Sequence, residues 1–239
     1  MTELLYQTES YLQEFDANIT SVLTVERAVV LARTAFYPGG GGQPCDFGIL
    51  TIAGTTYPVE KVKKQGNDVM HFLGGDLPLP SIGTASHGTL DWARRYKLMR
   101  THTALHVLCG TVFRDYGALV TGGDMEPLKG RMDFEFETMR GELVREIEAA
   151  VNKEVGQARE IRVKILPREE AFQIPDLIRT KINLLPEGIM QIRTVEIVGL
   201  DLQADGGTHV HNTNEVGKIR VVDYKSKGAI NKRLYIEIE

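Results

Sequence analysis

Short apolar runs separated by glycine and proline fill the first part of the chain, from Met1 to about Gly88. The clearest runs cover residues 19–30, 48–52, 57–62 and 69–73, and turn-forming residues bound each of them. Apolar runs of this length between turn formers predict β-strands. We therefore expect residues 1–88 to form a small β-barrel or sandwich.

The pattern changes after residue 88, where apolar positions recur at helical spacing. A long helix is predicted from Asp91 to about Tyr116, with Asp91 or Thr89 as its N-cap and Gly117 as its C-cap. A second helix is predicted from Glu142 to Val155, because apolar residues recur there at every fourth position.

Alternating segments complete the second part of the chain. Strands are predicted at residues 131–136, 161–165, 189–202, 218–224 and 233–238, and a hairpin turn at residues 121–124. Residues 89–239 are therefore expected to form an α+β domain, a two-layer arrangement of helices on a mostly antiparallel sheet.

Composition limits the classes of protein to consider. The chain has 239 residues, of which 42% are hydrophobic and 25% charged, enough to bury a core. No apolar stretch is long enough to span a membrane, the start lacks a signal-peptide layout, and Cys45 and Cys109 form no disulfide framework, so a cytoplasmic location is expected. With a net charge of −4, any nucleic-acid binding would depend on local basic patches.

Two short segments offer metal ligands. His102 and His106 are four residues apart on the predicted helix, so both imidazoles leave the same face, while Asp205 and His209 flank a Gly-Gly turn. Three imidazoles and a carboxylate suit Zn²⁺. A histidine pair alone is more often a partly buried polar edge of a helix, and the second segment favours the metal hypothesis.

A run of four glycines, Gly39–Gly42, is expected to need positive φ angles or close approach to another group, although a flexible surface turn is the alternative. A basic cluster opens the long helix, and it either forms a solvated face or binds a phosphate-bearing ligand. The members of that cluster are Arg94, Arg95, Lys97 and Arg100.

Four segments appear in the same order as in alanyl-tRNA editing proteins of the AlaX type, which are free-standing relatives of the editing domain of alanyl-tRNA synthetase. The chain resembles this family over essentially its whole length. The segments are residues 36–48 with the glycine run, 100–106 with Arg-Thr-His-Thr-Ala-Leu-His, 129–134 with Lys-Gly-Arg-Met-Asp-Phe, and 205–210 with Asp-Gly-Gly-Thr-His-Val.

The resemblance implies a β-barrel carrying the glycine-rich loop, joined to an α+β editing domain, and a zinc-dependent hydrolase of tRNA-Ala mischarged with serine and often glycine. A monomer or weak dimer without a membrane partner is expected. By the same resemblance, Thr34 discriminates the serine hydroxyl, although it could simply end a strand, and Gln43 contacts the terminal adenosine or the reacting ester. The remaining residues assigned to substrate are Gly39, Gly40, Gly41, Gly42, Thr208, Arg131 and Asp133, the last two of which could instead pair across a strand.

Asp205 departs from the family, which usually has Cys-Gly-Gly-Thr-His with the cysteine as a zinc ligand. A carboxylate is a legitimate zinc ligand, but it is harder than a thiolate. Asp205 could instead orient a water, and Cys109 or His211 could supply the missing ligand. A binding module with a structural or absent metal is the alternative function. The Gly-Gly-Gln triplet also resembles peptide release factors, but the chain lacks their strongly basic domain.

Overall fold

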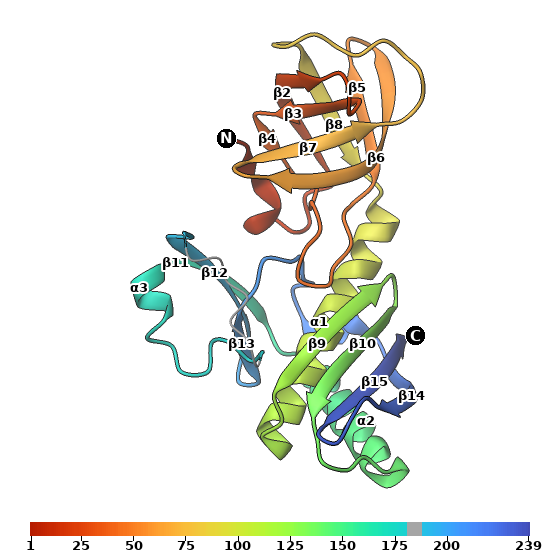
Figure 1. The fold of residues 1–239 in the computed structure, drawn as a ribbon, viewed down its shortest axis with the longest axis vertical. Helices are drawn as coiled ribbons and strands as arrows, with labels where there is room; N and C mark the ends of the chain where they lie inside the picture. Colours follow the sequence, from red (N-terminus) through yellow and green to blue (C-terminus); the bar gives the residue numbers. More distant parts are fainter. Residues whose placement is uncertain (181–187) are drawn as a thin grey trace. The chain divides into compact units, whose positions relative to one another are not determined.

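The computed structural model describes residues 1–180 and 188–239. The chain divides into two compact units, Met1–Lys97 and Leu98–Glu239, and each is described by itself (Figure 1). The predicted fold class is confirmed, because a closed barrel comes first and antiparallel sheets with helices follow. The division into domains of residues 1–88 and 89–239 stays a prediction.

The first unit is built around a closed barrel with strand order β2-β3-β7-β6-β5-β8. A parallel pair of short strands, β1 (Glu3–Leu4) and β4 (Arg33–Thr34), adjoins the 3₁₀ turn η1 (Leu5–Gln7). The barrel strands are β2 (Glu14–Leu23), β3 (Ala28–Leu31), β5 (Gly48–Ile52), β6 (Thr55–Gln65), β7 (Asp68–Leu73) and β8 (Ala85–Leu90).

Alternation in β2 shows which side chains fill the interior of the barrel. Phe15, Ala17 and Ile19 are buried while the residues between them are exposed, so one face of the strand enters the core. Gly88 lies beside Phe15, and a Cβ at this position would come within 2.5 Å of the ring. The barrel core therefore depends on a missing side chain as well as on apolar ones.

His71 lies fully buried in the barrel, where its Nε2 is 2.8 Å from the hydroxyl of Thr34 and its Nδ1 is 3.3 Å from the carbonyl of Val29. Burial lowers the pKa of His71 to about 4, although hydrogen bonds to the backbone oppose the shift. The imidazole is therefore neutral in the folded protein at neutral pH.

Stability of the barrel unit is expected to fall as the pH drops from about 6.5 to about 4, because the unfolded chain then binds a proton that folded His71 does not. Across this window the loss should total about 3 kcal/mol. Trp92, the only tryptophan, belongs to the same unit, so its fluorescence can follow denaturant unfolding at each pH. His71→Gln should give a flatter dependence on pH, and parallel curves for parent and variant would contradict this account.

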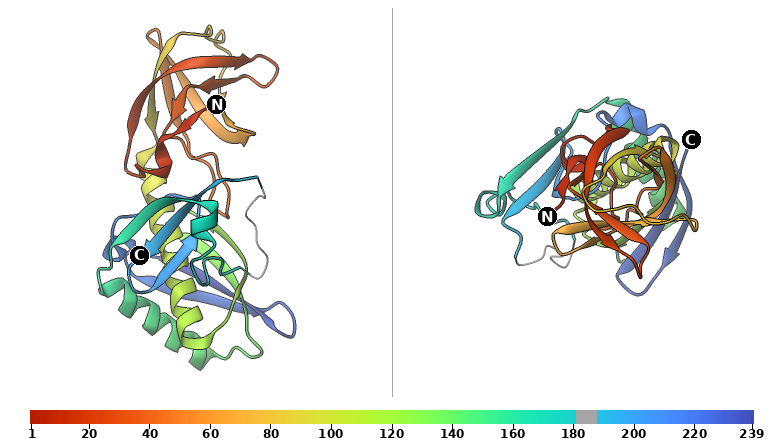
Figure 2. Two further views of the ribbon diagram at one scale, coloured as in Figure 1. Left: turned by 90° about the vertical axis from the view of Figure 1, so that its left-hand side faces the viewer. Right: turned by 90° about the horizontal axis from the view of Figure 1, so that it is seen from above.

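In the second unit a four-stranded antiparallel sheet has the order β14-β15-β10-β9, and the helices α1, which belongs to this unit from Leu98 on, and α2 lie on one of its faces (Figure 2). A separate three-stranded antiparallel sheet has the order β11-β12-β13. The elements are α1 (Trp92–Tyr116), β9 (Val120–Glu126), β10 (Lys129–Glu135), α2 (Gly141–Gly156), β11 (Ile161–Pro167), α3 (Arg168–Ala171), β12 (Gln191–Ile197), β13 (Asp201–Ala204), η2 (Thr213–Val216), β14 (Ile219–Ser226) and β15 (Asn231–Ile238).

The long helix α1 has the predicted ends. The carboxylate of Asp91 accepts a hydrogen bond from the backbone N–H of Arg94 at 3.0 Å, and Gly117 follows the helix with φ +66°. Residues 101–112 are all buried. In this part of the helix Leu105 packs against Gly130 of the four-stranded sheet and Gly110 packs against Asp201 of the other sheet, so α1 is covered on two sides.

Two sequence expectations are wrong. Residues 121–124 belong to β9 rather than to a turn, and the chain reverses at Leu128, which has φ +63°. The strand expected over residues 189–202 is a hairpin, because Gly199 adopts φ +74° between β12 and β13. Among the described residues, no helix is long and apolar enough to cross a membrane.

Candidate metal centre

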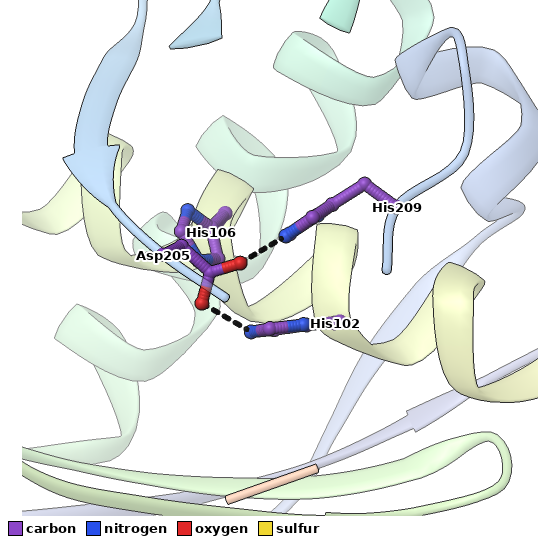
Figure 3. A group of neighbouring side chains, drawn as sticks. All are labelled: His102, His106, Asp205 and His209. Atoms are coloured by element: carbon purple, nitrogen blue, oxygen red, sulfur yellow. Dashed lines mark hydrogen bonds and ion pairs between the residues drawn. The ribbon is translucent and has the colours of Figure 1, made fainter. Parts of the chain in front are cut away.

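His102, His106, Asp205 and His209 come together in the second unit, and their side chains point toward one another (Figure 3). The two α1 histidines lie one turn apart on the helix, while Asp205 and His209 belong to the loop that leaves β13. One potential ligand atom from each residue lies within 4.8 Å of the others. The structure therefore joins the two segments that the sequence placed about a hundred residues apart.

The carboxylate of Asp205 lies between two imidazoles. Its Oδ2 is 3.0 Å from Nε2 of His209, and its Oδ1 is 3.5 Å from Nε2 of His102. The ring centroids of the three histidines are 4.3–5.1 Å apart. The backbone N–H of Gly207 donates to the same carboxylate at 2.8 Å, which fixes its orientation within the loop.

Three of the four side chains are held in the protonation state that a metal ion requires. Burial lowers the pKa of His102 well below its ordinary value and that of His209 to about 4. Burial would raise the pKa of Asp205, but the adjacent histidines outweigh it and hold this pKa well below the usual range. Burial also opposes charge on His106, yet the hydrogen bond and charge of Asp201 raise its pKa. At neutral pH His102 and His209 therefore offer lone pairs beside one anionic carboxylate, while His106 has to give up the more tightly held proton on its Nε2 when a metal binds.

The donor set fits a zinc ion. Ligand atoms about 2.1 Å from a tetrahedral ion lie roughly 3.4 Å apart. Two separations around Asp205 are 3.0 and 3.5 Å, and all four ligand atoms lie within 4.8 Å of one another. All four side chains are at most 12% exposed. Imidazole and carboxylate are also the ligand types of many zinc sites, so the chemistry and the spacing agree.

Three further side chains contact the ligands. The hydroxyl of Thr103 lies 3.1 Å from Nδ1 of His209, and Arg193 donates to the backbone carbonyl of Asp205 at 2.9 Å while its guanidinium lies 3.5 Å from the carboxylate. Asp201 accepts from Nδ1 of His106 at 3.1 Å. The sequence interpretation missed these residues. The polar alternation of Asp201, Gln203 and Asp205 was the signal that could have identified Asp201.

The two alternative ligands lie outside the group. Cys109 is buried one turn after His106, and its sulfur accepts a hydrogen bond from Gln203 at 3.3 Å. Burial raises the pKa of the Cys109 thiol, which disfavours the thiolate that a metal requires. His211 is exposed. Asp205 is therefore the fourth member of the group, and its role as a ligand stays a prediction.

The glycine-rich loop belongs to the first unit, and its conformation requires glycine. All four residues from Gly39 to Gly42 have positive φ, and the expectation of such angles is confirmed. The backbones of Gly40 and Gln43 exchange two hydrogen bonds at 2.9 and 3.0 Å, which makes a tight two-residue hairpin turn of Gly41 and Gly42. The loop is a defined turn rather than a flexible segment.

Gln43 is 2% exposed at the end of this turn, and Thr34 is fully buried. The Thr34 hydroxyl lies 2.8 Å from His71 and accepts the backbone N–H of Phe36 at 3.1 Å, so the threonine has a structural role in the barrel. Contacts of Gln43, Thr34 and Gly39–Gly42 with substrate stay predictions.

The basic cluster does not form one solvated face. Arg95 is fully buried, with its guanidinium paired to Asp46, and this excludes the predicted phosphate contact. Arg100 donates to the backbone carbonyls of Val216 and Glu239, and Arg94 stacks over Phe47 at 4.3 Å. Lys97 is exposed. Nucleic-acid contact by Arg94, Lys97 and Arg100 stays a prediction.

Arg131 and Asp133 lie in β10, on the face opposite Gly130, which packs against Leu105 of α1. Asp133 accepts two hydrogen bonds from Arg233 at 2.6 and 2.7 Å, directly across the strand pair. The arrangement supports the cross-strand alternative over a place beside the histidines. Thr208, also predicted to contact substrate, is fully buried next to His209.

Comparison with known proteins agrees with the two-part architecture. Residues 6–94 match the family "tRNA synthetases class II (A)", and residues 192–235 match "Threonyl and Alanyl tRNA synthetase second additional domain". Alanine–tRNA ligase of Ignicoccus hospitalis is 37% identical over 92% of the chain, which spans 24% of that ligase.

Two relatives match along their whole length. Alanyl-tRNA editing protein AlaX-M of Saccharolobus solfataricus is 38% identical, with 100% of both chains covered, and AlaX-M of Methanosarcina acetivorans is 36% identical, with 100% of this chain and 99% of the relative covered. Identity of this extent, together with both halves of the fold and the histidine cluster, shows that the chain belongs to the AlaX-M family of alanyl-tRNA editing proteins.

Proposed function

We propose that the protein is a trans-editing deacylase that hydrolyses the ester of mischarged tRNA-Ala, with Ser-tRNA-Ala and Gly-tRNA-Ala as substrates and Zn²⁺ as cofactor. Full-length identity to AlaX-M proteins supports alanyl-tRNA editing, and the cluster of His102, His106, Asp205 and His209 is the observation that supports a zinc-dependent reaction. A cytoplasmic location, where charged tRNA is used, belongs to the same proposal.

For this reaction the protein mainly has to position the reactants and stabilise the charge that develops on the ester. An aminoacyl ester is already activated, so the site has to bring water to the carbonyl and stabilise the oxyanion that develops. Bound Zn²⁺ would supply Lewis acidity, either toward a water or toward the amino acid. Asp205 is negatively charged and held by Gly207 and Arg193, so its carboxylate is oriented before any ligand arrives.

Discrimination of serine from alanine needs a polar partner for the serine hydroxyl, because apolar pockets distinguish near-isosteres poorly. In the proposal Thr34 has this role, and Gln43 contacts the terminal adenosine or the ester. Because the carbonyl of Val29 can only accept, Nδ1 of His71 carries the proton, and Nε2 accepts a hydrogen bond from the hydroxyl of Thr34. Toward a substrate, the oxygen of Thr34 would therefore act as an acceptor. A serine hydroxyl can donate to such an acceptor.

The direct test measures deacylation of tRNA-Ala charged with serine, glycine or alanine. We expect the zinc-loaded protein to hydrolyse the seryl and glycyl esters and to spare the alanyl ester. Treatment with a chelator should abolish hydrolysis, and added Zn²⁺ should restore it. Threonyl-tRNA-Thr, whose ester is equally activated, controls for unspecific hydrolysis.

The outcomes separate the two candidate functions. Protein that contains zinc, binds tRNA-Ala and leaves all three esters intact would be a binding module with a structural metal. Hydrolysis that persists after complete removal of metal would support the proposed deacylase activity and contradict its dependence on zinc.

A further inference from the structure

A second carboxylate stands behind the metal centre. Asp201 opens β13, and its buried side chain accepts a hydrogen bond from Nδ1 of His106 at 3.1 Å. The same oxygen, Oδ2, accepts from Nε2 of Gln203 at 2.6 Å. Because an ionised carboxylate can only accept, Nδ1 of His106 carries the proton and its Nε2 keeps the lone pair.

The strand β13 and the residue that follows it bring both carboxylates to histidines of α1. Side chains two residues apart share a face of a strand, so Asp201 and Gln203 face the same way. Asp205 follows the strand directly, and its backbone N–H donates to the carbonyl of Arg193 at 3.1 Å. Leu202 and Ala204 take the other face, where they pack against an apolar cluster with Leu177 and Ile192. The register of β13 against β12, with Ile197 opposite Asp201 and Thr194 opposite Ala204, holds this orientation.

Gly110 gives an independent sign that the close approach of Asp201 is built into the fold. It lies one turn after His106 on the same face of α1, and a Cβ there would be 2.9 Å from Cβ of Asp201 and 3.1 Å from the carbonyl oxygen of Leu200. Glycine inside a helix costs about 1 kcal/mol relative to alanine. Gly110 is therefore unfavourable for the helix itself, but the methyl group of an alanine at this position would push β13 away from His106.

We propose that Asp201 is a positioning residue of the metal centre, which fixes the tautomer and orientation of His106, and that Gly110 makes room for it. The inference rests on the proposed zinc site. Carboxylates behind metal-binding histidines have this role in other zinc proteins, and their removal typically weakens metal affinity 10–100-fold. Arg179, whose Nε lies 3.7 Å from Oδ1 of Asp201, suggests the competing structural role, that of a buried counter-ion.

The test measures Zn²⁺ affinity of the full-length protein by competition with a chromogenic chelator, and the absorption spectrum of the Co²⁺-loaded protein. Asp201→Ala should bind Zn²⁺ about 10–100-fold more weakly and shift the Co²⁺ bands, because His106 loses its orientation. Asp201→Asn, which keeps an acceptor oxygen and lacks the charge, should lose less. Gly110→Ala should also bind more weakly, and it should lower stability although alanine is the better helix former.

Thr213→Val is the matched control. Thr213 is a fully buried polar residue of the same unit whose hydroxyl accepts from Arg159 at 2.9 Å, and it has no contact with the four ligands. Its removal should leave metal affinity and the Co²⁺ spectrum unchanged. Circular dichroism of each variant establishes that it is folded, and Asp201→Asn carries the test if Asp201→Ala does not fold.

Folded Asp201 variants that bind Zn²⁺ within about twofold of the parent, with an unchanged Co²⁺ spectrum, would overturn the proposal and leave Asp201 as a counter-ion. A parent protein that binds neither metal overturns it together with zinc dependence. A parent that binds metal without deacylating contradicts the proposed function alone, since the effect of Asp201 on metal affinity is still measured.

Discussion

Replacing His209 with alanine is expected to lower Zn²⁺ affinity by more than about 100-fold, because the loss of a direct ligand should exceed that of a residue behind one. Deacylation should fall to the background rate in the same variant. His209 contributes an imidazole that is 2% exposed and lies 3.0 Å from the Asp205 carboxylate. Metal content after dialysis and single-turnover hydrolysis of Ser-tRNA-Ala measure the two effects.

His211→Ala makes the same chemical change two residues further on, at an exposed position outside the cluster. It should leave metal content and hydrolysis close to the parent values. Equal losses in the two variants would contradict the assignment of His209 as a ligand, and hydrolysis that persists in metal-free His209→Ala would separate the reaction from the metal.

Asp205 variants extend the same experiment to the position where the chain departs from its family. Asp205→Cys should retain zinc, because a thiolate carries the same charge and binds at a similar distance. Asp205→Ala should weaken binding to an extent comparable with His209→Ala. Unchanged affinity in Asp205→Ala would show that Asp205 orients water or merely pairs with Arg193, which lies 3.5 Å away.

The largest effect on stability is expected for Arg95→Ala, with a loss of about 3–5 kcal/mol in the free energy of unfolding. Arg95 is fully buried, and its guanidinium donates to both oxygens of Asp46 and to the carbonyls of Ser10 and Ala35. Without Arg95, Asp46 would be a buried carboxylate with no compensating cation. Denaturant unfolding followed by Trp92 fluorescence measures the loss within this unit.

Lys97→Ala removes a positive charge two residues along the same helix, at an exposed position. It should change stability by less than about 0.5 kcal/mol. A similar loss for both variants would mean that Arg95 acts through general charge rather than through the buried pair. Asp46 also accepts the backbone N–H of Tyr37 at 2.6 Å, so the glycine-rich loop should become more susceptible to proteolysis in Arg95→Ala only.

The spacing of apolar residues predicted the elements in which one face is buried along the whole length. The helix from Trp92 to Tyr116 and the alternating strand from Asn231 to Ile238 each present one repeating pattern, so the sequence located both. The glycine pair at residues 122–123 misled because glycine is typical of turns, whereas here both residues belong to the edge strand β9 and pair with β10. The turn propensity of the two glycines therefore mattered less than the hydrogen bonding of their strand to β10.

The candidate site was predictable to the extent that its chemistry is local. His102 and His106 share a helix face at four-residue spacing, and Asp205 and His209 share a loop, so each pair was visible in the sequence. The burial of Arg95 was not, because it depends on Asp46, which is distant in sequence. The polar alternation at residues 201, 203 and 205 marked Asp201 in the sequence, but its contact with His106 depends on the packing of β13 against Gly110 of α1.

Asp201 and Asp205 are four residues apart and both contact histidines of α1, which restricts how this sequence can change. An insertion or deletion of one residue between the two aspartates would invert the facing of one of them, turning a carboxylate toward the apolar cluster that Leu202 and Ala204 now contact. Substitutions at residues 202 and 204 are limited only by size and polarity, whereas the length of this segment cannot vary by one. We therefore expect this part of the chain to tolerate substitutions but not insertions or deletions of one residue.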